Sequence, residues 1–310
     1  MVLWRRKEAK LNMMQEKINM NVWVVIPTWN RKVDLLECLH SVMASDYPKV
    51  KIIVVDNASE DNSVVTVNKQ FPNVEIIELD KNMGAAFASN RGFEIALKNQ
   101  ADFILRLDSD IIIEPQMNTK LVDSFEDLPE AGIMFPKILR YDSPDTIWFT
   151  GAKSHPFLLV NRINNYNVKD NNDYKISQVD YVPSAAILIK REALKKVGGF
   201  DEIYFVYSED FDLCLRFKKN GYKTYYIPTA KAWHKIGSDK LSRWGVEQFY
   251  RGRMIFYKQN ARGLHRIALL IYAFIYVFYR WIFSPSHEPI IPALKGLVAG
   301  LKAKKPIVFQ

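Results

Sequence analysis

The sequence predicts an α/β fold, with a mostly parallel, Rossmann-like sheet covered by helices on both faces and a helical tail after it. Between residues 21 and 115, short β-branched runs alternate with segments that carry apolar residues at helical spacing, a pattern typical of βαβ units. Several of these runs end in Pro or Asp, at the edge where parallel sheets bind ligands. Residues 267–283 form a longer, aromatic-rich apolar run, which predicts the tail.

Four strands are expected in the first half, each a short apolar run bounded by turn residues. The runs are VWVVIP, KIIVVD, VEIIELD and DFILRLD, at residues 22–27, 51–56, 74–80 and 102–108. Helices are predicted between them over 31–44 and over 83–100, the second opening with glycine. Thr28 or Asn30 stands where a side chain could cap the first helix. Because parallel strands end at one edge of a sheet, their polar terminal residues should gather there.

The second half is less regular. The segments 133–142 and 146–152 are predicted to pair as antiparallel strands, and the polar segment 164–175 indicates a loop. An amphipathic helix is expected after Glu209, and a strand over 223–228.

The tail combines apolar, aromatic and basic residues. Residues 267–283 are apolar except for Arg280 and are fewer than the roughly 20 residues that a spanning helix needs. Residues 292–305 follow, apolar on one side and basic at their end. We expect the region 264–305 to be an interfacial membrane anchor. A buried packing helix and a single membrane span are the alternatives.

Composition limits the size and the partners. The 310 residues are 48% hydrophobic, and 43 Lys and Arg against 34 Asp and Glu give a charge of +9. This charge suits nucleotide phosphates, acidic lipids or nucleic acid. Cys38 and Cys214 lack metal-site or disulfide spacing, which favours a reducing compartment. Residues 1–20 are basic without the apolar core of a secretory signal, so we expect a surface-lying leader.

Asp108 and Asp110 stand one residue apart at the end of a predicted core strand. Neighbouring carboxylates are costly to ionise unless water, a cation or a donor compensates. Mg²⁺ or Mn²⁺ binds one or two carboxylates together with phosphate oxygens, so the pair could hold a metal and its phosphates. A solvated turn with an Asp cap is the structural alternative, and the spacing alone does not decide.

Other polar stretches also carry two interpretations. Asp56 could accept a hydrogen bond from a nucleobase, or belong to the capping of the next helix. The segment 82–92 allows close backbone approach, but it matches neither the dinucleotide-binding nor the P-loop pattern. Burial of Glu209 and Asp210 beside aromatic residues would raise their pKa and suit a general base, although acidic residues also favour helix starts. His234 is a candidate metal ligand only beside a metal site.

Six stretches, in this order, resemble the family 2 glycosyltransferases of the GT-A fold, most closely the rhamnosyltransferase-like branch. They are VVIPTWNR, VVDNASEDNS, NMGAAFASNRG, LRLDSD, AAILIKREALKKVGGFDEIYFVYSEDFDLCLR and WHKIGSD. The resemblance covers residues 21–260, with a nucleotide-binding half over 21–115 and an acceptor half over 116–260, and leaves 261–310 as the helical tail.

The resemblance implies an inverting, divalent-metal-dependent enzyme. It would move a sugar from a UDP- or dTDP-sugar to a hydroxyl of a lipid-linked or cell-surface glycan, in polysaccharide biosynthesis. The reaction would take place at the cytoplasmic side of the cell membrane, with the protein held peripherally or by a single C-terminal span.

The resemblance also implies a role for each matched residue. Asp210 would be the general base for the acceptor hydroxyl, with Glu209 in support. Asp110 and His234 would hold Mg²⁺ or Mn²⁺. Ser184 departs from the family, which often has Gly at this position. The residues implied in donor binding are Pro27, Thr28, Asn30, Asp56, Asn82, Gly84, Asn90 and Asp108.

Three other function classes fit less well. A sugar nucleotidyltransferase usually carries a Gly-rich phosphate loop after its first strand, whereas IPTWNRK contains no glycine. A nucleic-acid partner is not expected, because the basic residues are spread through helices and tail rather than gathered on an aromatic platform. A membrane scaffold without catalysis is opposed by the presence of every acidic residue that the chemistry needs.

Overall fold

The computed structural model describes residues 20–155, 157–236, 241–283 and 289–304. The strands are β1 (Val22–Thr28), β2 (Val50–Asp56), β3 (Glu75–Glu78), β4 (Phe103–Leu107), β5 (Ile111–Ile113), β6 (Ala131–Arg140), β7 (Ile147–Phe149), β8 (Ala152–Ser154), β9 (Asn161–Ile163), β10 (Ser177–Val179), β11 (Ala186–Lys190) and β12 (Lys223–His234). The helices are α2 (Lys32–Met43), α3 (Ser63–Gln70), α4 (Ala85–Lys98), α5 (Met117–Asp127), α6 (Arg191–Val197), α7 (Glu209–Lys219), α8 (Arg243–Asn260), α9 (Gly263–Phe283) and α10 (Ile290–Lys302). Apart from Met20, the leader predicted over 1–20 lies outside the described residues.

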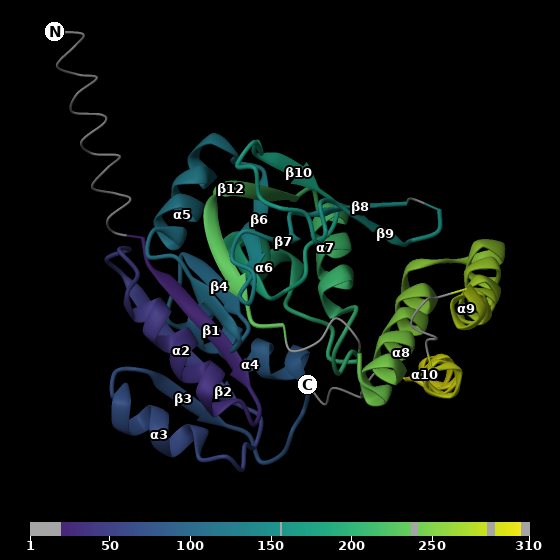
Figure 1. Cartoon of the computed structure of the whole chain (residues 1–310), viewed down its shortest axis with the longest axis horizontal. Coiled ribbons are helices and arrows are strands. Elements are labelled where there is room, and N and C mark those ends of the chain that lie inside the picture. The colour runs from purple at the N-terminus through teal and green to yellow at the C-terminus, as the bar shows by residue number, and fades with distance from the viewer. Residues whose placement is uncertain (1–19, 156, 237–240, 284–288, 305–310) are drawn as a thin grey trace, which may run out of the picture.

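One large sheet forms the centre of the molecule, in the order β10-β12-β6-β11-β4-β1-β2-β3 (Figure 1). In the first half β1 pairs in parallel with β2 and β4, and β2 with β3, which confirms the parallel arrangement predicted there. The sheet as a whole is mixed, because β11 runs antiparallel to both β4 and β6. The central strands are buried on both faces, so apolar runs suit them.

The second half adds the antiparallel pair predicted over 133–142 and 146–152, observed as β6 with β7. The segment 164–175 has no helix or named strand, as predicted. It is held to the sheet by Lys137, whose ammonium group lies 2.7 Å from each carboxylate oxygen of Asp170. Both side chains are almost fully buried, so removal of either one would leave an unpaired buried charge.

Helices α8, α9 and α10 lie together to one side of the sheet (Figure 1) and share a second hydrophobic cluster. Gly296 and Gly300 of α10 allow this packing, because a Cβ atom at either would lie under 3 Å from the backbone of α8. Leu269, Ala273 and Val277 form the buried face of α9. The tail predicted over 261–310 therefore contributes α9 and α10, which pack with the preceding helix α8 in a three-helix layer.

The outer face of α9 is apolar and uncovered in the described structure. Ile271, Ile275 and Phe278 are exposed by 55%, 61% and 45%. With 21 residues, α9 is the one described helix whose length and composition would let it cross a membrane. It is longer than the apolar run 267–283 because the helix begins at Gly263.

Candidate active site

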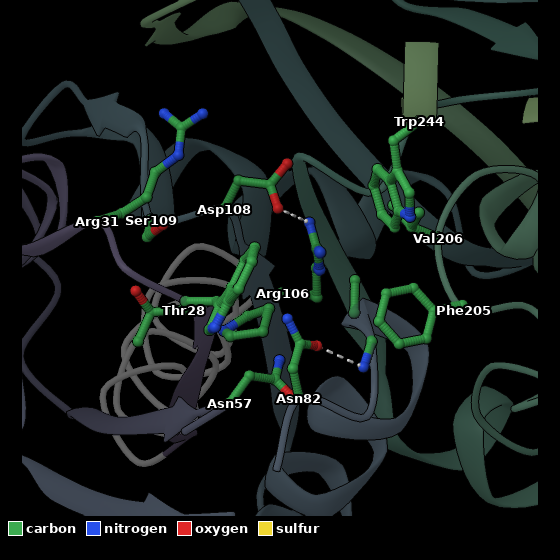
Figure 2. Close-up of a pocket in the computed structure, with 14 residues that line it drawn as sticks. Thr28, Arg31, Asn57, Asn82, Arg106, Asp108, Ser109, Phe205, Val206 and Trp244 are labelled. Atoms are coloured by element: carbon green, nitrogen blue, oxygen red, sulfur yellow. Dashed lines mark hydrogen bonds and ion pairs between the residues drawn. The ribbon is translucent and has the colours of Figure 1, made fainter. Parts of the chain in front are cut away.

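A cavity of about 640 Å³ opens where β1 and β4 end (Figure 2). Five of the residues predicted to bind the donor line it: Pro27, Thr28, Asn82, Gly84 and Asp108. Gly84 has φ of 88°, and a Cβ atom there would lie 2.3 Å from the carbonyl oxygen of Phe205. Only glycine fits this position, because other residues meet both strain and a backbone clash.

Asp56 pairs with Thr28 in the sheet and does not line this cavity. Its side chain is buried, and Oδ2 accepts a hydrogen bond of 2.8 Å from the N–H of Ser59. The other oxygen, Oδ1, is buried without a partner in the described structure, and so is Oγ1 of Thr28, the residue paired with Asp56 in the sheet. Unpaired buried oxygens are costly, which suits a site that a hydrogen-bonding ligand completes.

Asn30 and Asn90 do not line the cavity either. The carbonyl of the Asn30 side chain accepts a 2.7 Å bond from the N–H of Glu60 and holds the loop after β2. The Asn90 side chain makes two hydrogen bonds of 2.9 Å with the backbone of Phe200. The capping prediction for Thr28 and Asn30 is wrong. Thr28 belongs to β1, and the N–H of Lys32, the first residue of α2, donates its hydrogen bond to the carboxylate of Asp61 instead.

Asp108, Asp110 and His234 lie together at the edge of the cavity, with their ligand atoms all within 4.8 Å of one another. Strand pairing brings His234 to the two carboxylates, because β12 pairs with β5 and sets His234 opposite Ile111. Nε2 of His234 lies 3.3 Å from Asp110, while its Nδ1 is buried without a partner in the described residues. Two carboxylates and an imidazole are a fitting ligand set for Mg²⁺ or Mn²⁺.

Cationic side chains compensate the two carboxylates. Arg106, which is buried, contacts Asp108 at 2.6 Å, as Figure 2 shows, and Arg31 contacts Asp110 at 3.1 Å. Burial opposes the ionisation of Asp110, but the hydrogen bond from His234 and the charges of His234 and Arg31 outweigh it and lower its pKa. Asp110 is thus an anion at neutral pH.

Glu209 and Asp210 begin α7, directly after two residues with left-handed backbone, Tyr207 and Ser208. Asp210 accepts hydrogen bonds from the hydroxyl of Tyr181 at 3.0 Å and from the N–H of Phe211 at 2.7 Å. Burial raises the pKa of Asp210 in spite of these bonds. Burial and the neighbouring Asp210 raise the pKa of Glu209 to about 8.

Asp210 opens into a second, smaller cavity of about 100 Å³ rather than into the donor cavity. Aromatic side chains dominate its walls. The lining residues are Leu159, Asn161, Tyr181, Tyr207, Ser208, Asp210, Phe211, Phe249, Arg253 and Phe256. A carboxylate with a raised pKa among aromatic rings can accept a proton from a bound hydroxyl group.

Sequence reasoning missed several residues of the donor cavity. Arg106 carried a signal, because a charge within the apolar run FILRLD is unusual for a buried strand. Trp244 carried none, because it stands outside the matched stretches and reaches the cavity from α8. Phe205 stood in a matched stretch, in the aromatic run before Glu209, without an assigned role, and Figure 2 shows both side chains at the cavity. Trp29, Arg31 and Asn57 stood in quoted stretches without an assigned role and also line the cavity.

The family model described as "Glycosyl transferase family 2" matches residues 23–198. An N-acetylglucosaminyl-diphospho-decaprenol L-rhamnosyltransferase of Mycobacterium tuberculosis is 26% identical, covering 79% of this chain and 87% of the relative. The dTDP-rhamnosyl transferase RfbF of Shigella flexneri is also 26% identical, covering 77% and 80%.

Solved structures are similar in fold at lower identity. S. aureus TarS 1–349 superposes with a TM-score of 0.56 at 19% identity, over 91% of this chain and 81% of that one. GalNAc-T7, solved with UDP, GalNAc and Mn²⁺, gives 0.61 at 15% identity, over 92% and 55%. These likenesses confirm the predicted GT-A fold class.

Proposed function

This chain belongs to glycosyl transferase family 2 and is a glycosyltransferase, and we propose that it transfers a sugar from a UDP- or dTDP-sugar to a hydroxyl of a lipid-linked or cell-surface glycan, with inversion. A rhamnosyl group is the sugar we propose first, because both rhamnosyltransferases named above resemble the chain. The single observation that carries the proposal is the cavity of about 640 Å³ with Asp108, Asp110 and His234 at its edge.

The donor nucleotide is proposed to lie across the ends of β1 and β4. Among the described residues, Oδ1 of Asp56 and Oγ1 of Thr28 are buried oxygens without a hydrogen-bond partner, and Oδ1 of Asp56 suits the ring N–H of a uracil or thymine base. Pro27, Asn82 and Gly84 line the adjoining wall. Asn30 and Asn90 keep a supporting role in this proposal, since each fixes a loop rather than facing the cavity.

Asp110 and His234 would hold Mg²⁺ or Mn²⁺, with Asp108 beside them. When bound, the cation supplies positive charge that stabilises the departing diphosphate. Arg31 lines the same cavity and adds a second positive charge for the phosphate oxygens. Before the donor binds, Arg31 compensates Asp110.

Asp210 is the proposed general base. It removes the proton from the acceptor hydroxyl as that oxygen bonds to the anomeric carbon, and the bond from this carbon to the diphosphate oxygen breaks on the opposite face. The configuration therefore inverts, and the nucleoside diphosphate leaves with the bonding electrons. Glu209, with its pKa raised to about 8, stays protonated at neutral pH, so that a single negative charge occupies this buried pair.

The helical layer is proposed to hold the enzyme on the cytoplasmic side of the membrane. The outer face of α9 carries apolar side chains, and Arg262 and Arg266 are exposed at the start of the helix. Such a face suits a surface with acidic headgroups. Because Leu269 and Ala273 pack into the second hydrophobic cluster, we favour a helix that lies on the membrane over one that spans it.

Transfer of label tests the proposed activity. Purified protein is incubated with Mn²⁺, a labelled UDP- or dTDP-sugar and a bacterial lipid extract, with Asp210→Asn as the matched control. The proposal expects label in the lipid-soluble product with the wild type alone. Equal amounts of labelled product with both proteins would show that Asp210 is not the general base. No consumption of any donor by the wild type would contradict the proposed activity.

A further inference from the structure

We propose that the second cavity is an acceptor subsite in which Arg253 binds a phosphate group of the acceptor, so that the enzyme acts on a sugar phosphate ester whose charge lies close to the attacked hydroxyl. The inference rests on the proposed function, because it takes Asp210 as the general base. It adds the substrate class: a sugar joined through phosphate or diphosphate to its carrier.

The packing of α8 brings Arg253 to the base. Gly252 lies against the turn that precedes Asp210, where a Cβ atom would be only 2.5 Å from the carbonyl oxygen of Tyr207 and 3.0 Å from the hydroxyl of Ser208. The absence of a side chain lets α8 approach this turn closely. As a result, the next residue of the helix, Arg253, lines the same small cavity as Asp210.

The guanidinium group of Arg253 is surrounded by aromatic rings rather than by acids. It lies 5.2 Å from the ring centre of Phe249 and 5.6 Å from that of Tyr276. Among the described residues, Arg253 forms no ion pair with a carboxylate. Cation–π contacts hold a guanidinium group in one orientation without neutralising its charge. The planar N–H donors of the group match the geometry of phosphate oxygens. Arg253 therefore offers a positioned charge for an anionic ligand.

The small size of the cavity selects the kind of acceptor. Asp210 and Arg253 line the same cavity of about 100 Å³, so a ligand that contacts both needs a hydroxyl and a negative charge near each other. A sugar 1-phosphate ester meets this condition, while the distant end of a long neutral glycan does not. The rings of Phe211 and Phe256 stack on each other with their centres 4.3 Å apart and add an apolar wall to the cavity.

The surroundings of the subsite connect it to the proposed membrane surface. Tyr276, which contacts Arg253, belongs to α9, whose outer face carries the exposed Ile271 and Ile275. The loop that contributes Leu159 to the cavity also reaches α9, where Phe157 stacks on His265 with ring centres 4.5 Å apart. A phosphate bound by Arg253 would thus sit beside the helix that is proposed to meet the lipid.

The experiment is a calorimetric titration of the full-length protein with decyl diphosphate, with UDP or dTDP and Mn²⁺ already at saturation so that the donor site is filled. Octyl glucoside serves as the uncharged amphiphile. The variants are Arg253→Met, Arg253→Lys and, as a control that removes one exposed charge on α6, away from both cavities, Lys195→Met. Thermal unfolding of each variant checks that it is folded.

We expect decyl diphosphate to bind the wild type, to bind Arg253→Met at least about tenfold more weakly, and to bind Lys195→Met within about twofold of wild type. Arg253→Lys should bind with intermediate affinity, because it keeps the charge but loses the paired N–H donors of the guanidinium group. This variant provides the test if Arg253→Met does not fold. No binding by wild type, equal binding by Arg253→Met, or an equal loss in Lys195→Met would overturn the subsite. Failure of UDP and dTDP to bind would instead contradict the proposed function.

Discussion

The hydroxyl group of Tyr181 donates a 3.0 Å hydrogen bond to Oδ2 of Asp210, joining the loop before β11 to the first turn of α7. Burial and the adjacent Asp210 raise the pKa of Tyr181 well above its usual range, so the tyrosine stays protonated and remains a donor. The bond stabilises the carboxylate form of Asp210 and works against the burial that raises its pKa. Tyr181 is therefore placed to orient the proposed base and to set the pH at which it ionises.

Removal of this bond should shift the pH dependence of transfer. In Tyr181→Phe the carboxylate of Asp210 loses a donor, so its pKa should rise and the acidic limb of the kcat/KM profile should move to higher pH. The measurement is the profile of kcat/KM against pH for wild type and variant. A lower rate with an unmoved limb would mean that Tyr181 acts only through packing.

Loss of the base itself should have a larger effect. Asp210→Asn keeps the size of the side chain but cannot accept the proton, so transfer should fall about 10²- to 10⁴-fold. Nucleotide affinity should change little, because Asp210 lies outside the donor cavity. Asp212→Asn is a useful contrast, because Asp212 pairs with Arg216 at 2.6 Å and its loss should lower stability first. Substantial turnover by Asp210→Asn would assign the base to another residue.

Glu209 should make the protein less stable as the pH rises. Its pKa in the folded state is about 8, against a usual 4.5, so between these values the folded state binds a proton that the unfolded state has released. The free energy of unfolding should therefore fall with rising pH across this window. Glu209→Gln cannot ionise and should remove this part of the slope. Urea unfolding at several pH values measures it, and equal slopes in both proteins would contradict the assignment.

Membrane attachment should depend on the outer face of α9. Deletion of the whole tail is a poor test, because Leu269 and Val277 pack into the second hydrophobic cluster and their loss would uncover α8. The triple variant Ile271→Ser, Ile275→Ser and Phe278→Ser changes exposed residues only. We expect it to bind vesicles containing phosphatidylglycerol at least about tenfold more weakly, since apolar burial drives interfacial binding.

Two controls complete the membrane test. Donor hydrolysis by the triple variant should stay close to wild type, since α9 does not line the donor cavity. Alkaline carbonate should release the wild-type protein from membranes, as expected of a helix that lies on the surface. Protein that stays in the carbonate pellet would indicate a span, and undiminished vesicle binding by the triple variant would remove α9 as the contact surface.

Much of the fold could be predicted from the sequence, because its signals are local. The segments that form β1, β2 and β4 are rich in β-branched residues and are buried on both faces. Such segments can be predicted as strands without knowing which strands they pair with. The position of Asp108 and Asp110 follows from the end of one strand. His234 lies near these carboxylates because β12 pairs with β5 in a particular register. No local sequence pattern predicts this pairing, and the metal-binding role of His234 was predicted from the family resemblance alone.

The rest depended on contacts between distant parts of the chain. Asn90 belonged to a matched motif, yet its side chain binds Phe200, 110 residues away, and not the cavity. Trp244 enters the donor cavity through the packing of α8, which no local pattern encodes. In the sequence, Arg253 cannot be distinguished from any other charged residue on the surface of a helix. Only the close approach at Gly252 places it beside Asp210.

The central claim is a donor site for a nucleoside diphosphate with a divalent cation, and it can be tested by calorimetric titration with UDP, dTDP and GDP, each with and without Mn²⁺. We predict that UDP or dTDP binds more tightly with Mn²⁺ than without it, and that Asp110→Ala abolishes this difference, since Asp110 is a proposed metal ligand. Failure of all three nucleotides to bind under either condition, or an equal Mn²⁺ effect in Asp110→Ala, would contradict the account.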